Sequence, residues 1–201
     1  MDQTFPYCSS LTSEQFLFYE IRIAARYYMD GVTIQDAVQI IKKDNLFQYP
    51  TERHISRLAR ACYKRLDALD NASLVRALAT APSEIAKPIN LYAIMRYSRL
   101  VWEFMVQVIG EKYRSQDWSF SQKDLNTFFS RLQAQEDSVA AWKETTISRI
   151  KGVFVRMLVE TGYLDGVRKT TLNAVFLSEA LEQGIKANHD DIVLPAFHYF
   201  R

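Results

Sequence analysis

Apolar side chains recur at helical spacing along most of the chain, and this periodicity constrains the fold more than any other feature of the sequence. Apolar residues that return every three or four positions lie on one face of a helix, which can then pack against a core. The pattern is clearest at Ile55, Leu58, Ala59, Cys62, Leu66 and Leu69. We therefore expect an all-α fold with at most a small β-hairpin.

The first helix is expected to begin near Thr12. Thr12 and Gln15 have the spacing of a capping box, and Leu11 and Phe16 have that of a hydrophobic staple. Gly31 fits the position just after a helix end, where the backbone often adopts a left-handed conformation. These signals predict that the first helix ends before Gly31.

Two further helices are predicted on either side of the connection 44–50. Thr33 is expected to cap a short helix that ends near Lys43, and Thr51 a longer one that ends near Asp70. A short helix, a connection and a basic amphipathic helix follow the order of a helix-turn-helix, whose second helix reads the major groove of DNA. The connection is longer than the three or four residues usual in that motif.

A central helix is expected after a break at Ala79–Pro82, where small residues and a proline interrupt the pattern. Its start is either Ser83 or Pro88. We favour Pro88, because the first turn of a helix accommodates proline best. The helix is expected to reach Tyr113 and to be buried on nearly all sides.

Two more helices are expected in the C-terminal part of the chain. Ser121 and Asp124 form a second capping-box pattern, which predicts a helix to about Ala134. Ser138 is then expected to cap a long helix that ends at Gly162.

The residues beyond these helices predict a winged-helix-like ending. Asp165-Gly166 lies between apolar residues, which is the signal for a two-residue β-hairpin. A last helix is expected at 178–183, followed by an apolar tail at 192–200. The predicted organisation is an N-terminal helix-turn-helix-like subdomain (1–80), a central helix and linker (81–118), and a C-terminal winged-helix-like subdomain (119–201).

Positive charge is concentrated in two segments, although the 201 residues carry a net charge of only +2. Residues 42–65 hold seven basic side chains against two acidic ones, and residues 143–169 hold six against three. Residues 1–41 hold two basic side chains against five acidic ones. Concentrated charge creates a local field that the total conceals, and here it favours an anionic partner.

The first candidate site is the basic face of the predicted helix 51–70. Its residues share one face because they step by four, three and four positions: Arg53, Arg57, Arg60 and Lys64. A solvated helix face usually carries mixed charge, whereas Glu52 is the only acid here before Asp67. The stripe therefore favours phosphate binding over simple exposure to solvent. Arg53 and His54, near the helix start, are candidates for contacts with base edges.

A second set of cations gives weaker evidence for a site: Lys143, Arg149, Arg168 and Lys169. Lys143 and Arg149 do not share one narrow face, and Glu144 and Glu160 are close in sequence. Arg168 and Lys169 follow the predicted hairpin, where a wing would contact the DNA backbone, but any exposed turn can carry two cations.

Patterns typical of catalysis or metal binding are missing from the sequence. The three histidines form no HxxxH or HExxH motif, and the six glycines form no GxxxxGK[ST], GxGxxG or GxSxG motif. His189 with Asp190 and Asp191 is either a weak metal site or a solvated acidic turn, and the turn is the simpler interpretation. We expect a protein that is not an enzyme and holds no cofactor and no metal.

Cysteine usage and hydropathy favour a cytoplasmic location. Cys8 and Cys62 are too few for a disulfide framework, which fits a reducing compartment. The first residues lack the basic start and apolar stretch of a secretory signal. No run of 18 residues is apolar without a charge, so we expect no membrane span.

Several short segments recur in an order and spacing that point to one family: Leu11-Thr12 with Phe16-Leu17, Asp44–Gln48, Arg65-Leu66 with Leu69-Asp70, Glu103–Met105, Asp124–Phe129, Trp142–Ile150 and Leu158–Gly162. In these segments the chain resembles the BrxA family of the bacterial BREX (bacteriophage exclusion) defence systems. The resemblance covers residues 5 to about 165. It implies a helical accessory protein that binds double-stranded DNA without cutting it, in a system whose proteins together methylate host DNA and block phage replication.

The family offers no catalytic residues and no short DNA-binding motif to transfer, so the candidate residues rest on charge geometry. The first hypothesis is a sequence-tolerant binder of double-stranded DNA. The second is an adaptor for other BREX proteins, with Phe197, Tyr199 and Phe200 of the apolar tail at its interface. A third is binding of structured RNA through phosphate and 2′-OH contacts. Aromatic residues lie mainly at core spacing, which disfavours stacking on single-stranded bases.

Overall fold

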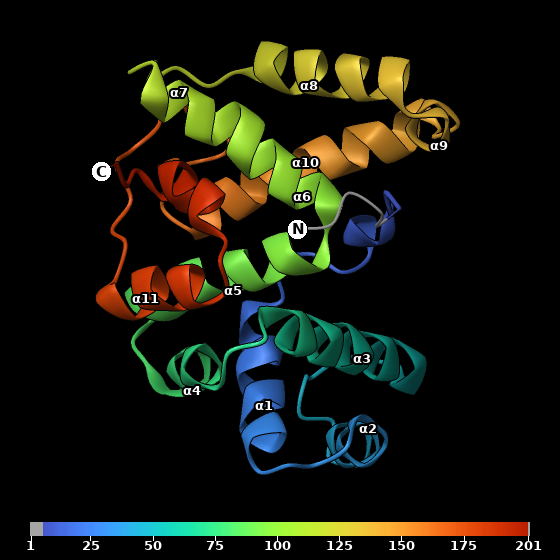
Figure 1. Cartoon of the computed structure of the whole chain (residues 1–201). Helices are drawn as coiled ribbons and strands as arrows, with labels where there is room; N and C mark the ends of the chain where they lie inside the picture. Colours follow the sequence, from blue (N-terminus) through green and yellow to red (C-terminus); the bar gives the residue numbers. More distant parts are fainter. Residues whose placement is uncertain (1–5, 201) are drawn as a thin grey trace. The chain divides into compact units, whose positions relative to one another are not determined.

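The computed structural model describes residues 6–200 and divides the chain into two compact units made of helices (Figure 1). Unit 1 comprises 6–15, 98–177 and 189–200, and unit 2 comprises 16–97 and 178–188. The chain therefore passes from one unit to the other four times. The three predicted segments are each continuous in sequence, whereas the two units are interleaved along it. Strands are absent from the described residues, so the all-α prediction is confirmed.

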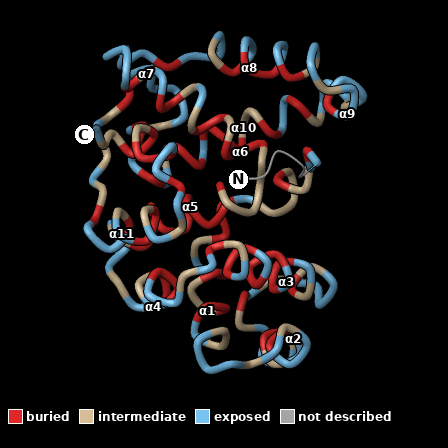
Figure 2. The backbone as a smooth tube through the Cα atoms, in the orientation of Figure 1, coloured by how far each residue is buried: buried red, intermediate tan, exposed pale blue. Residues whose placement is uncertain are grey.

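Unit 2 is organised around a long central helix that packs against three others. Its helices are α1 (Phe18–Met29), α2 (Ile34–Lys43), α3 (Glu52–Leu69), α4 (Ala72–Thr80), α5 (Ser83–Tyr97) and α11 (Glu179–Ala187). The central helix, α3, packs against α1, α2 and α5. Leu58, Ala59 and Cys62 are buried on its inner side, and buried and exposed residues alternate along it in Figure 2. The amphipathic pattern of this helix was therefore predicted correctly.

Capping signals placed the second helix well but misplaced the start of the first. Thr33 accepts a hydrogen bond from the amide of Asp36 and caps α2 as predicted. Gly31 has a φ of 72°, which is the left-handed backbone predicted after α1. The predicted cap at Thr12 was wrong, because its hydroxyl donates to the carbonyl of Ser9 within the short 3-10 helix η1. The helix α1 begins only after Leu17, whose own backbone is left-handed.

The residues from 71 to 97 form two helices where sequence patterns had predicted less order. Asn71 accepts a hydrogen bond from the amide of Leu74 and caps α4, a helix that was not predicted. For the helix predicted to reach Tyr113, the preferred start at Pro88 was wrong, because α5 already begins at Ser83. Pro88 removes one hydrogen bond near the start of α5. Glu84, whose carbonyl loses that partner, is exposed to solvent.

A close approach of two helices in unit 2 depends on a glycine. The helix α11 packs against α4, with Gly184 facing Leu74. A Cβ atom at position 184 would lie 2.5 Å from Leu74 Cδ1, which is closer than real contacts allow. Because Leu74 is fully buried, it has little room to retreat. Glycine therefore permits α11 to cover α4.

Unit 1 is built around an aromatic core. Its elements are η1 (Ser10–Thr12), α6 (Arg99–Phe104), the π-helix η2 (Met105–Gly110), α7 (Glu111–Arg114), α8 (Gln122–Gln135), α9 (Asp137–Ala140), α10 (Glu144–Glu160) and the 3-10 helix η3 (Asp191–Phe197). The ring of Phe104 stacks on Phe154 at 4.2 Å and meets Phe128 edge-on at 5.6 Å. These contacts join α6, α8 and α10.

Helix boundaries in unit 1 were predicted with mixed success. The capping box of Ser121 and Asp124 forms as predicted and starts α8. The prediction of one helix reaching Tyr113 was wrong, because Ser98 is extended and the helix turns into a π-helix after Phe104. The predicted cap at Ser138 was also wrong. It lies inside the single-turn helix α9, and α10 begins after Lys143.

The predicted β-hairpin at Asp165-Gly166 was wrong, and the predicted wing is therefore not formed. The amide of Asn173 donates to the carbonyl of Tyr163 at 2.9 Å, and its side chain donates to Asp165 at 2.8 Å. These bonds fold the segment into turns rather than two paired strands. The only β-type contact in residues 6–200 is an isolated antiparallel bridge between Ser119 and Thr171.

Two further predictions concern the end of the chain and the membrane. The helix predicted at 178–183 is present as α11 and is capped by Ser178, which accepts from the amide of Leu181. His189 and Asp191 are exposed and Asp190 is buried, so the interpretation of a solvated acidic turn holds for two of its three residues. Among the described residues, no helix is long and apolar enough to cross a membrane.

Candidate nucleic-acid interface

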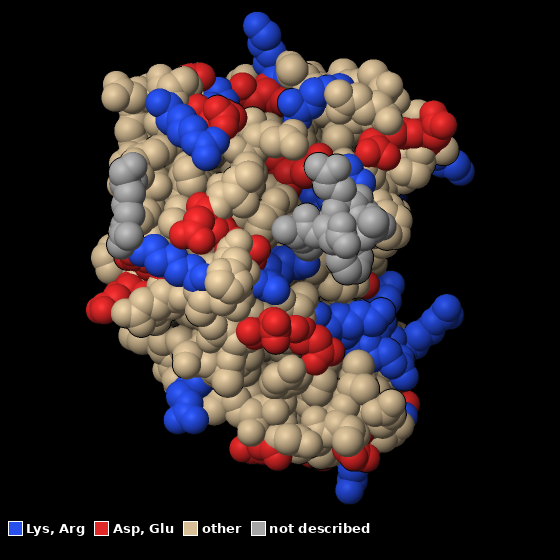
Figure 3. Space-filling model, viewed as in Figure 1, with Lys and Arg blue, Asp and Glu red and all other residues tan. Residues whose placement is uncertain are grey.

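The four cations predicted on the third helix all project from the outer side of α3. The four exposed side chains are those of Arg53, Arg57, Arg60 and Lys64. The residues between them are buried or half-buried. Figure 3 shows Lys and Arg side chains gathered over α3, toward the right of the view. The predicted sharing of one face follows from helical geometry and is present in the structure.

Acidic residues do not neutralise this face. Glu52, the acid nearest in sequence, forms an ion pair with Lys42 of α2 at 3.4 Å. Within the part of the chain that the structure describes, the four cations have no ion-pair partner. Four unpaired positive charges on one helix face repel one another, and an anion that binds among them removes that repulsion.

The N-terminal half of α3 borders a hollow of about 490 Å³. Five residues of α3 and its N-cap line it: Thr51, Arg53, His54, Arg57 and Arg60. Thr51 is the N-cap of α3, but its side chain makes no capping hydrogen bond. The positive end of the helix and three arginines therefore face the same space, which suits a negatively charged ligand.

One side of the hollow is held in a fixed position by aromatic contacts. The ring of His54 lies 4.6 Å from that of Tyr49, which belongs to the connection between α2 and α3. The Tyr49 hydroxyl donates to the buried Glu20 of α1 at 2.8 Å. Burial and this hydrogen bond raise the pKa of Tyr49 to about 12. Sequence patterns gave no signal for this arrangement, because its members come from three different segments.

The second predicted set of cations lies in unit 1. All four are exposed, but they come from two separate places: Lys143 and Arg149 from α10 and its N-cap, and Arg168 and Lys169 from the turns that replace the predicted hairpin. The two predicted sets thus belong to different compact units. None of these four residues lines the hollow beside α3.

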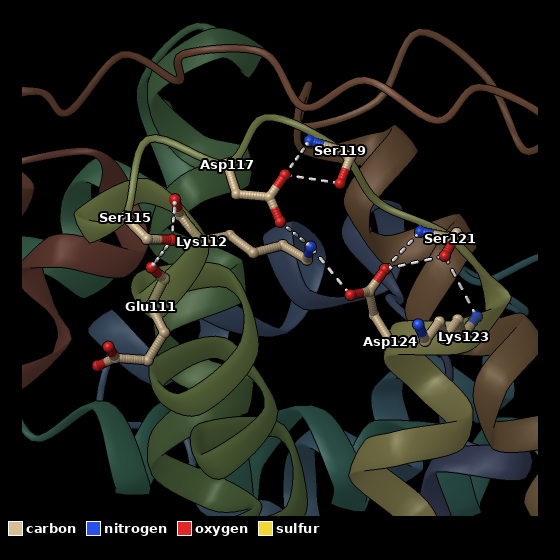
Figure 4. A network of polar contacts seen from close by, with 8 residues as sticks. All are labelled: Glu111, Lys112, Ser115, Asp117, Ser119, Ser121, Lys123 and Asp124. Carbon is tan, nitrogen blue, oxygen red and sulfur yellow. Dashed lines mark hydrogen bonds and ion pairs between the residues drawn. The ribbon is translucent and has the colours of Figure 1, made fainter.

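Unit 1 contains a charged network that was not predicted from the sequence. Lys112 donates to Asp117 at 2.7 Å and lies 2.9 Å from Asp124, so one ammonium group joins α7, the following loop and α8 (Figure 4). Hydrogen bonds from Lys112 and Ser119 hold the pKa of Asp117 well below its usual range. Burial alone would raise the pKa of Asp124, but bonds from Lys112 and Ser121 lower it.

A scan against family models matches residues 5–189 to the BrxA family. A "BREX protein BrxA" of Bacillus cereus (strain H3081.97) is 33% identical over 158 residues, which are 79% of this chain and 78% of the relative. The chain belongs to the BrxA family. The resemblance seen in the sequence up to about residue 165 is therefore confirmed, and it extends through α11.

More distant BrxA relatives and a solved structure agree with this assignment. A "BREX protein BrxA" of Paramagnetospirillum magneticum is 20% identical over 87% of each chain, and one of Escherichia coli O9:H4 (strain HS) is 23% identical over 79% of this chain and 74% of the relative. The crystal structure of an uncharacterized protein from Magnetospirillum magneticum has a TM-score of 0.81 at 19% identity, covering 95% of this chain and 97% of that one. These comparisons assign the chain to the BrxA family of BREX defence systems, and the solved structure has the same fold.

Proposed function

We propose that this BrxA protein is a cytoplasmic, non-catalytic accessory factor of BREX defence that binds double-stranded DNA through phosphate contacts from α3. One observation carries the proposal: four exposed cations share one face of α3 and have no ion-pair partner among the described residues. A protein keeps such a face against its own repulsion when an anionic partner offsets it.

The length of the cationic face suits a duplex. Arg53 and Lys64 are eleven residues apart, which is about 16 Å along a helix at 1.5 Å per residue. The major groove is about 12 Å wide and admits a helix, and phosphates on one strand rise by about 3.4 Å each. The face can therefore reach several phosphates along one groove. The packing of α2 against α3 is compatible with a helix-turn-helix-like mode, in which α3 enters the groove.

Binding of this kind depends strongly on salt. If six to eight phosphates are engaged, affinity should fall about 10³- to 10⁵-fold between 50 and 200 mM salt, because each contact releases condensed counterions. Reaching that number requires cations beyond those of α3, and the set in unit 1 is the source that we propose.

The test is fluorescence anisotropy with a labelled 30-base-pair duplex at these two salt concentrations. The test variant changes all four α3 cations to Glu: Arg53, Arg57, Arg60 and Lys64. A matched control makes the same change in net charge at four other exposed positions: Arg26, Lys43, Arg76 and Arg156. Circular dichroism and thermal melting check that both variants fold.

We expect salt-sensitive binding by the wild type, its loss in the folded α3 variant and most of it retained in the control. Equal loss in both variants would reduce the effect to net charge, and salt-independent binding would contradict phosphate contact. A single-stranded DNA and an RNA hairpin of equal length serve as competitors. Stronger competition by the hairpin than by the duplex would favour the RNA hypothesis.

A second candidate function, an adaptor for other BREX proteins, is favoured by large apolar side chains exposed in unit 1. Phe176 is 71% exposed and Ile192 is 58% exposed. The tail residues predicted for this role differ in exposure: Phe197 is buried, whereas Phe200 is exposed. Co-purification with BREX proteins should weaken in a Phe176→Ser, Ile192→Ser variant. Unchanged co-purification would count against the adaptor.

A further inference from the structure

The surface beside α3 is hollowed as well as positively charged. The volume of the hollow is about 490 Å³, and it is an open depression because all the residues that line it belong to α3 or its N-cap. Phosphates are contacted from outside by long flexible cations, and such contacts need no depression in the surface. A space of this size, at the start of a helix that is expected to enter the major groove, can receive the edge of a base.

His54 differs from the arginines that surround it. The arginines are exposed, with long side chains that can follow a phosphate. His54 is half-buried, and its ring is tilted by 32° against the ring of Tyr49, at a centroid distance of 4.6 Å. A ring held in this way presents its polar edge in one orientation. Sequence-specific contacts require such fixed donors and acceptors, because the pattern on a base edge is directional.

Tyr49 is in turn fixed from two sides. Its hydroxyl donates to Glu20 Oε1 at 2.8 Å, and its amide donates to Asn45 Oδ1 at 3.1 Å. Glu20 is buried in α1, so the Tyr49 ring is anchored to the core of unit 2. At neutral pH the Tyr49 hydroxyl is protonated and therefore a donor, and its raised pKa of about 12 extends this to more alkaline pH.

This arrangement explains the long connection between α2 and α3. A tight turn of three or four residues would join the two helices directly. Here residues 44–51 separate them, and Asn45 and Gln48 adopt left-handed backbone conformations. The additional residues place Tyr49 against His54. The connection that departs from the usual motif is thus the segment that supports the hollow.

Resting on the proposed function, we infer that His54 determines base specificity at this interface by contacting a guanine in the major groove, and that Tyr49 positions its ring. Guanine offers two acceptors there, O6 and N7, and either can accept a hydrogen bond from a ring N–H of His54. The arginines supply sequence-independent affinity, and His54 selects among the sequences so bound.

The test is selection from a pool of 30-base-pair duplexes whose central ten base pairs are randomised, sequenced before and after binding. The variants are His54→Ala, Tyr49→Phe, which loses only the hydroxyl, and Arg57→Ala as the phosphate-contact control. The wild type should enrich sequences with a guanine at a defined position. Preference for that guanine should fall about tenfold or more in His54→Ala, which is the usual scale of one good base contact.

The controls separate this inference from the proposed function. Arg57→Ala should weaken binding to all sequences equally and leave the enriched pattern unchanged. Tyr49→Phe should keep overall affinity but reduce the preference part of the way, which a loss of folding would not do. Duplex binding without any enrichment, or an unchanged pattern in His54→Ala, would overturn the inference alone. Absence of duplex binding by the wild type would overturn the proposed function as well.

Discussion

Two groups of basic side chains, one in each unit, are used in opposite ways. In unit 1, Lys112 lies between two carboxylates, and Arg99 donates to Glu103 at 2.8 Å and to Glu136 at 3.1 Å. In unit 2, four cations of α3 face solvent without acidic partners among the described residues: Arg53, Arg57, Arg60 and Lys64. A count of basic residues per segment therefore says little about function. Pairing decides which cations hold the fold and which remain available for a ligand.

The largest expected effect concerns the salt dependence of DNA binding. Each lost phosphate contact should reduce the slope of log K against log salt by about 0.9. Changing the four α3 cations to Ala should lower the slope by about 3–4, and the same change at Lys143, Arg149, Arg168 and Lys169 by about 2 or less, because these lie at two separate places in unit 1. Anisotropy titrations at five salt concentrations measure both slopes. A larger effect from unit 1 would reverse the comparison.

A smaller effect is expected on stability, and here a substitution in unit 1 should cost more than one in unit 2. Lys112→Met leaves Asp117 and Asp124 without their shared cation, which should cost about 1–2 kcal/mol of unfolding free energy, since solvent reaches part of this network. Arg57→Met should change stability by less than about 0.5 kcal/mol, as expected for an exposed residue without partners. Urea denaturation compares the two. Equal losses of unfolding free energy in the two variants would show that ion pairing does not distinguish Lys112 from the exposed Arg57.

The pH dependence of stability supplies a control for Lys112→Met. The folded protein holds the pKa values of Asp117 and Asp124 below their usual range. Such groups add stability above the unfolded pKa of about 3.9, and this stability is lost as the pH falls through the lower folded values. Acidification below about pH 4 should thus destabilise the wild type more steeply than the variant. Parallel curves would indicate that Lys112 is not the cause.

The smallest expected effect concerns two helix caps. Ser121 caps α8 in a complete capping box, so Ser121→Ala should cost about 1 kcal/mol. Thr51 stands at the N-cap of α3 without a side-chain bond, and Thr51→Ala should cost less than about 0.5 kcal/mol. Thermal melts resolve this difference, and a cost at Thr51 equal to that at Ser121 would argue against an open helix start at the hollow.

Helices with strong periodicity and local caps could be predicted from the sequence. Thr33, Ser121 and the inner face of α3 are examples, because neighbours within four residues determine them. The helix α4 was missed although Asn71 is a typical cap followed by apolar residues at helical spacing. That error was avoidable, since the signal was local.

Other features depend on residues distant in sequence. Leucine has no preference for the left-handed backbone that Leu17 adopts, so nothing marked the true start of α1. The Asp165-Gly166 signal was overruled by Asn173, which bonds to the same segment. In the candidate site, the shared face of the four cations could be predicted from their spacing. The contacts of Tyr49 with both His54 and Glu20 could not be predicted, because the three residues come from different segments of the chain.

The interleaved units have a consequence for biosynthesis. A ribosome releases residues 16–97 well before α11, the last helix of unit 2. At a rate of roughly 5–20 residues per second, the 80 or so residues in between take about 4–16 s to make. Throughout that interval Leu74 of α4 is not covered by α11, which packs against it at Gly184 in the folded protein. The nascent chain therefore exposes part of an apolar core for seconds, during which chaperones can bind it.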